Sequence, residues 1–125
     1  MKSRGVLIAV VLGAMAAAAC GGARTVTEKR ILEWGPVLNV FMGTNFQNAN
    51  SYPASLEEVP PHMAGDLKKT DGWGHPLLYR RLRIDLYNII SAGPDGNFGN
   101  DDDIVMQNGM LYEPSKIYTE HPLER

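Results

Sequence analysis

Four aspartates lie close together in the C-terminal third of the chain, at positions 95, 101, 102 and 103. They belong to the stretch SAGPDGNFGNDDDIV (residues 91–105), whose glycines allow the backbone to turn sharply. Ca²⁺ takes about six to eight oxygen ligands from carboxylates and backbone carbonyls, so such a loop could hold this ion. Counted from Asp95, however, the twelfth position of an EF-hand is Met106 rather than glutamate. The residues alone therefore leave two readings open, a solvated acidic turn and a calcium site of another kind.

Few other residues have spacings that would support chemistry. The three histidines, His62, His75 and His121, are scattered, and no serine has a histidine and an aspartate in a setting typical of nucleophilic catalysis. The sequence therefore predicts that the protein is not an enzyme. We expect Asp71 to close a turn and Trp73 to anchor the core rather than to bind a ligand.

The N-terminus has the pattern of a secretory signal. Lys2 and Arg4 precede an apolar run that ends at Ala19, and Cys20, the only cysteine of the chain, follows. This run is shorter than the roughly 20 residues that a spanning helix needs. We predict a signal peptide at 1–19, a cysteine and short tether at 20–24, and one folded domain at 25–125.

The residues around Cys20 suggest a lipid anchor. Ala17 to Ala19 and Gly21 around the cysteine resemble the lipobox of bacterial lipoproteins, which implies a diacylglyceryl group on the thiol and palmitate-type acylation. The alternative is a plain secretory signal whose cysteine happens to lie at the cleavage site. Gly21, in place of an aspartate, implies by the same resemblance a position in the cell envelope, at the periplasmic face of the outer membrane.

Charge argues against one class of partner. The chain has 12 basic and 14 acidic residues, and loss of Lys2 and Arg4 would take the formal charge from −2 to about −4. An acidic protein has no general attraction for phosphates. We therefore expect no nucleic-acid partner.

The mature part begins with a helical pattern. Thr25 and Glu28 have the spacing of a capping box, which predicts a helix start at Thr25. Apolar residues then recur at steps of three and four, which predicts one buried face. These residues are Ile31, Trp34, Leu38, Phe41, Met42 and Phe46. Gly35-Pro36 interrupts the pattern, so we expect a kink or two separate helical pieces there.

The second half of the chain has the pattern of strands. LLYRRLRIDLYNIIS (residues 77–91) favours a hairpin that turns near 81–85, and SLEEV (55–59) a single helical turn capped by Ser55. Asn108-Gly109 lies between apolar runs and predicts a two-residue type I′ turn. The expected fold class is therefore α+β, an N-terminal helix packed on a small antiparallel sheet.

Three motifs together resemble a known family. They are NSYPASLEEV (50–59), DGWGHPLLY (71–79) and DLYNIISAGPDGNFGNDDDI (85–104). In order and spacing they are similar to the C-terminal domain of the major pseudopilin of bacterial type II secretion. The resemblance implies a pseudopilin-like structural or accessory component of protein secretion, with secretion-system or other envelope proteins as partners. The alternative is a free-standing, calcium-stabilised envelope lipoprotein.

The resemblance also implies a calcium ion in the aspartate loop. It assigns Asp95 and Asp103 as the characteristic acids, Asp101 or Asp102 as a further acid, and backbone carbonyls near Ile90 and Ser91 as additional ligands. Alternation along an extended segment places Asp101 on the same side as Asp103, which favours Asp101 over Asp102.

Overall fold

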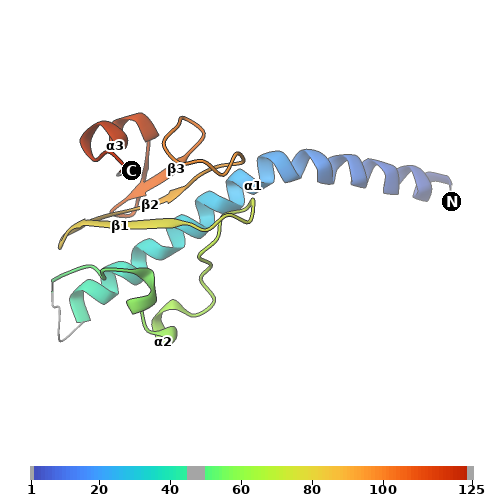
Figure 1. Cartoon of the computed structure of the whole chain (residues 1–125). Helices are drawn as coiled ribbons and strands as arrows, with labels where there is room; N and C mark the ends of the chain where they lie inside the picture. Colours follow the sequence, from blue (N-terminus) through green and yellow to red (C-terminus); the bar gives the residue numbers. More distant parts are fainter. Residues whose placement is uncertain (1, 45–49, 124–125) are drawn as a thin grey trace.

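A computed structural model describes residues 2–44 and 50–123, with side chains from Gly22 onward (Figure 1). A long helix, α1 (Lys2–Thr44), is followed by the short helical turns η1 (Leu56–Glu58) and α2 (Pro61–Ala64). Four strands come next, β1 (Leu78–Arg83), β2 (Leu86–Ser91), β3 (Ile104–Gln107) and β4 (Met110–Tyr112), and then helix α3 (Pro114–Glu120). This arrangement confirms the predicted α+β class.

Helix α1 is longer than the sequence pattern predicted. It begins at Lys2 and not at Thr25, so the capping-box prediction is wrong. The alanines before Cys20 are strong helix formers, and no proline separates them from Thr25, so the helix continues through this region. The side chains of the predicted signal peptide, and the lipidation predicted at Cys20, lie outside the described residues. Figure 1 shows the N-terminal half of α1 extending away from the rest of the molecule.

Pro36 lies inside α1 without dividing it. The helix continues to Thr44 as one element, so the alternative of two helical pieces is wrong. Proline has no backbone N–H, and the helix therefore lacks the bond that residue 36 would donate to the carbonyl of Leu32. In the part of the chain that the structure describes, no helix is both long and apolar enough to cross a membrane.

The apolar face of α1 forms the main core, as predicted. Ile31, Trp34 and Leu38 are fully buried, and Phe41 is almost so. The predicted core residue Phe46 lies outside the described residues. The indole Nε1 of Trp34 donates to the carbonyl of Lys68 at 2.9 Å, so the buried ring has a partner for its polar atom.

The four strands form an antiparallel sheet in the order β1-β2-β3-β4. Both predicted hairpins are present, and Asn108 and Gly109 have the positive φ angles, 50° and 94°, that a type I′ turn requires. One face of the sheet packs on α1. The other packs on α3, where Ile90 and Val105 contact Ile117 in a second apolar cluster.

Candidate functional site

The structure places the predicted calcium ligands in three separate environments. Ser91, at the end of β2, is fully buried, and its hydroxyl donates to Oδ2 of Asp71 at 2.6 Å. The Oγ of Ser91 also accepts the backbone N–H of Gly93 at 3.1 Å. Ser91 therefore stabilises the start of the loop through Asp71 and Gly93.

Asp95 belongs to the exposed part of the loop. Its Oδ1 accepts the backbone N–H of Asn97 and its Oδ2 the side-chain amide of Asn100, each at 2.9 Å. Asp101 and Asp102 are exposed as well. The alternation argument for Asp101 does not apply, because residues 101 and 102 form a turn and β3 begins only at Ile104.

Asp103 differs from the other three acids because only 1% of its surface is exposed. Its Oδ2 accepts the backbone N–H of Gly99 at 2.7 Å and the hydroxyl of Tyr118 from α3. Its Oδ1 is buried without a hydrogen-bond partner. Burial, and then the hydrogen bond to the Asp103 carboxylate, raise the pKa of Tyr118.

The acidic side chains among the predicted ligands do not lie together as one group. Among the described residues, no three histidine, cysteine, aspartate or glutamate side chains are grouped so that they could hold an ion. The negative charges of Asp95 and Asp103 are stabilised without an ion, because backbone and side-chain N–H groups donate to their carboxylates. Within the described part of this loop, the unpartnered Oδ1 of Asp103 is a feature that a cation would complete.

A second buried carboxylate belongs to Asp71, which is 1% exposed. Its Oδ1 accepts the backbone N–H groups of Trp73 at 3.0 Å and His75 at 2.9 Å, while its Oδ2 binds Ser91. The prediction that Asp71 closes a turn is therefore confirmed. Trp73 is only partly buried beside the core, in which Trp34 is the fully buried tryptophan.

The Asp71 loop is also bound to helix α1. The guanidinium of Arg30 donates to the backbone carbonyl of Asp71 at 2.9 Å and to that of Thr70 at 3.2 Å. The N–H of Gly72 donates to the hydroxyl of Thr27 at 2.7 Å. We call residues 70–75, with these bonds to α1 and to Ser91, the Asp71 clasp. Sequence reasoning missed the contributions of Thr27 and Arg30, since nothing near them in sequence indicates partners more than 40 residues away.

The clasp contains a serine, an aspartate and a nearby histidine, but its geometry is structural. Ser91 donates directly to the carboxylate of Asp71, and both side chains are shielded from solvent. A catalytic serine needs an exposed oxygen whose proton passes to a base. This arrangement instead fixes the end of β2 against α1.

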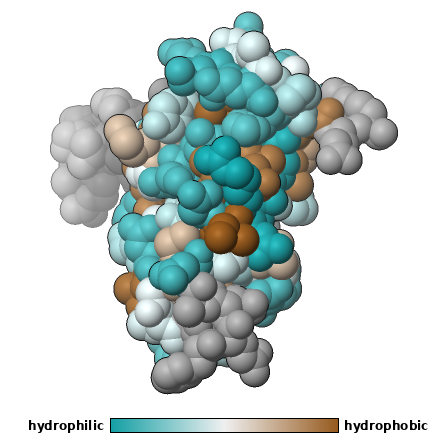
Figure 2. Space-filling model, turned by 90° about the vertical axis from the view of Figure 1, so that its left-hand side faces the viewer, coloured by the Kyte–Doolittle hydropathy of each residue, from teal (hydrophilic) through white to brown (hydrophobic). Residues whose placement is uncertain are grey.

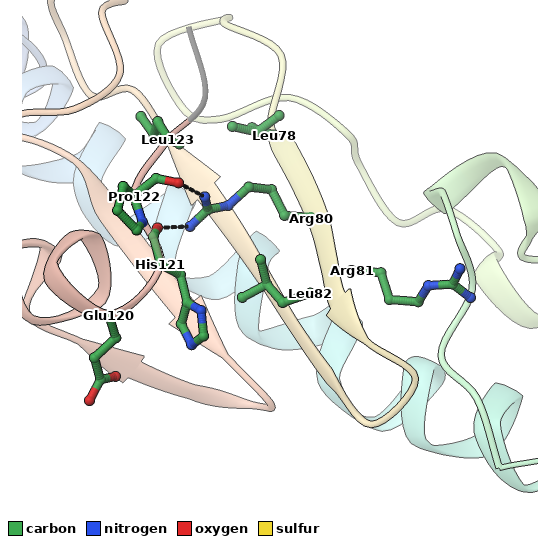
Figure 3. A pocket seen from close by; sticks show the side chains of 8 residues that line it. All are labelled: Leu78, Arg80, Arg81, Leu82, Glu120, His121, Pro122 and Leu123. Atoms are coloured by element: carbon green, nitrogen blue, oxygen red, sulfur yellow. Dashed lines mark hydrogen bonds between the residues drawn. The ribbon is translucent and has the colours of Figure 1, made fainter.

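A cavity of about 550 Å³ lies between β1 and the segment after α3 (Figure 3). The side chain of Arg80 extends over it and donates to the carbonyls of His121 at 2.9 Å and Pro122 at 3.0 Å. A third bond of 3.0 Å joins Arg80 to Oδ1 of the buried Asn88. These bonds hold the C-terminal segment over the outer face of the sheet.

The described residues thus define a small α+β domain, in which a four-stranded antiparallel sheet packs on part of one long helix. A family model for the L1 transposable element dsRBD-like domain matches residues 23–63, which is about a third of the chain. The match covers the second half of α1, all of η1 and most of α2, but none of the sheet. No curated protein and no solved structure matches the chain.

This match overturns the family prediction made from the sequence. The family whose model matches is the dsRBD-like domain, so the assignment to a type II secretion pseudopilin is wrong. The two roles drawn from it, a secretion component and a calcium-stabilised envelope lipoprotein, are wrong as well. The motifs that suggested them have local explanations, since Asp71 and Gly72 belong to the clasp, and Asp95 and Asp103 accept N–H groups of their own loop.

Proposed function

We propose that the protein acts as a non-catalytic binding domain whose partner is another protein. The observation that carries this proposal is an apolar strip on the outward face of α1. Leu32, Pro36 and Val40 follow one another at steps of four, so they share one side of the helix. Leu32 is 37% exposed and Val40 is 51% exposed.

The strip adjoins an apolar hollow. Pro36, Val37, Val40 and Met63 line a space of about 200 Å³ between α1 and α2. Scattered apolar residues are normal on any surface, but a hollow lined by apolar side chains is typical of contact sites. Figure 2 shows one face of the molecule, on which hydrophobic residues stand among hydrophilic ones.

Charge favours a protein over RNA as the partner. The segment that matches the dsRBD-like model has three basic residues against four acidic ones, Glu28, Glu33, Glu57 and Glu58. Of the basic residues, Arg24 is paired with Glu28 at 3.4 Å and Arg30 is bound to the clasp. Binding to RNA depends on positive side chains that reach phosphates, and this segment offers few.

A photo-crosslinking residue placed at Val40 tests the proposal. In the cells that make the protein, we expect a discrete protein adduct from position 40, because the hollow would be covered by the partner. The matched control is position 116, since Lys116 is exposed on α3, on the opposite face of the sheet. A crosslinker placed at Leu32 should give the same adduct. That adduct should disappear when Val40→Asp is added, because the new carboxylate would be buried in the contact.

Two outcomes would contradict the proposal. One is an equal yield of adducts from positions 40 and 116, or none from either. The other is salt-dependent binding of the purified chain to double-stranded RNA of about 20 base pairs, longer than the roughly 16 that a dsRBD spans. That second result would make RNA the partner.

We also propose, independently of the protein partner, that a calcium ion binds at Asp103. The unpartnered, buried Oδ1 of Asp103 supports it, since a carboxylate oxygen without a donor is satisfied by a cation. Asp95, Asp101 and Asp102 are the neighbouring acids in sequence. Asp95 would have to give up its hydrogen bonds with Asn97 and Asn100 in order to join the ion.

Thermal melting with and without millimolar calcium tests this second suggestion. A site of millimolar or somewhat higher affinity contributes about 1 kcal/mol, which raises the melting temperature by roughly 4–8 °C. The rise should disappear in Asp103→Asn and persist in Asp66→Asn, where the acid is exposed and lies far from the loop in sequence. An equal rise in both variants, or no rise in the wild type, would rule the site out.

A further inference from the structure

Asn108 is the only asparagine in the chain that is followed by glycine. In such a pair the backbone nitrogen of the glycine can attack the side-chain Cγ of the asparagine, because no Cβ hinders the approach. The bond from nitrogen to Cγ forms as the nitrogen loses its proton, and the side-chain amide leaves as ammonia. Water then opens the cyclic imide at either carbonyl, which gives aspartate or isoaspartate.

The side chain of Asn108 joins the two hairpins of the sheet. Its Oδ1 accepts the backbone N–H of Tyr87 at 3.0 Å, and its Nδ2 donates to the carbonyl of Asp85 at 3.1 Å. Its own backbone N–H donates to the carbonyl of Tyr87 at 3.2 Å. Asn108 is thus more than a turn residue, because it holds the β1–β2 turn against the β3–β4 turn.

The attacking atom, the backbone nitrogen of Gly109, is also restrained. The N–H of Gly109 donates to Sδ of Met106 at 3.1 Å, and Met106 is fully buried. The turn rests on helix α1, since a Cβ on Gly35 would lie 3.4 Å from Cα of Gly109. Attack on Cγ therefore requires that the turn first open and break these contacts.

We propose that Asn108 is a deamidation site, held back in the folded chain by these contacts, whose reaction separates the two hairpins. The aspartate product keeps an acceptor for the N–H of Tyr87. It loses the donor to the carbonyl of Asp85 and places a negative charge beside that oxygen. Isoaspartate adds a carbon to the main chain, which a two-residue turn cannot accommodate without losing its register.

Mass spectrometry of the full chain, aged in mildly alkaline buffer, tests the proposal. The change of an amide into a carboxyl should appear at Asn108, at least about tenfold more slowly than in a free peptide of residues 103–113. Tenfold corresponds to an opening free energy of about 1.4 kcal/mol. Reaction at the same rate in the chain and in the peptide would overturn the proposal. Faster deamidation of any other asparagine than of Asn108 would overturn it as well.

Two variants test separately the contact that slows the reaction and the loss of stability that follows it. Met106→Leu removes the sulfur acceptor at nearly constant volume and should speed the reaction by about threefold, whereas Met63→Leu in α2 should not. Asn108→Asp, which mimics the product, should lower the melting temperature by about 4–8 °C. Equal rates for the two methionine variants, or an unchanged melting temperature for Asn108→Asp, would contradict the proposal.

Discussion

Replacing Asp71 with alanine is expected to lower the free energy of unfolding by about 4 kcal/mol, as measured by urea unfolding followed through the fluorescence of the two tryptophans, Trp34 and Trp73. The carboxylate accepts three hydrogen bonds, from Trp73, His75 and Ser91. Hydrogen bonds to a charged group contribute about 1.5–3 kcal/mol each, and their loss would leave buried donors unpaired. The change should therefore weaken the connection between the clasp and the end of β2.

Asp71→Asn is the matched control for this prediction. An amide oxygen can still accept the two backbone N–H groups, and its NH₂ can donate to the hydroxyl of Ser91, so most of the network survives. We expect the free energy of unfolding to fall by less than half as much as in the alanine variant. If the alanine variant loses less than about 1 kcal/mol, the clasp does not hold the fold in the way that its hydrogen bonds suggest.

The α+β fold followed from signals that are local in the sequence. The apolar steps from Ile31 to Phe41 predicted the buried face of α1, and Asn108-Gly109 predicted the second hairpin. Each depends on the geometry of a single element, a helical period or a two-residue turn. The start of α1 was missed because a capping box is a weak signal when strong helix formers precede it.

The candidate sites could be predicted only in part. The role of Asp71 in its turn could be predicted from the sequence, because aspartate commonly accepts N–H groups from the residues just after it. Its links to Thr27 and Arg30 were not, because they join residues more than 40 positions apart. The aspartate loop shows a related limit, since composition reveals carboxylates but not whether an ion or an N–H group will face them.

The close contact between the clasp and α1 gives a second prediction of large effect, at Gly72. A Cβ at this position would lie 2.3 Å from the carbonyl oxygen of Ala23 and 2.9 Å from its Cα, and backbone atoms of a packed helix cannot easily move aside. Gly72→Ala should therefore push the loop away from α1 and break the 2.7 Å bond from Gly72 to Thr27. We expect a loss of about 3 kcal/mol in the free energy of unfolding, measured by the same urea titration.

Gly43→Ala provides the control that separates this clash from any general effect of replacing a glycine. Gly43 lies near the end of α1, and a Cβ there would meet no atom within 4 Å. Alanine favours the helical backbone over glycine, so this variant should gain up to about 1 kcal/mol. A lower free energy of unfolding for Gly72→Ala and a higher one for Gly43→Ala would establish that the approach of the clasp to Ala23 requires glycine at position 72. Equal effects of the two substitutions would show that the loop has room to move away from the helix, and the clasp would then not be a fixed connection between α1 and the sheet.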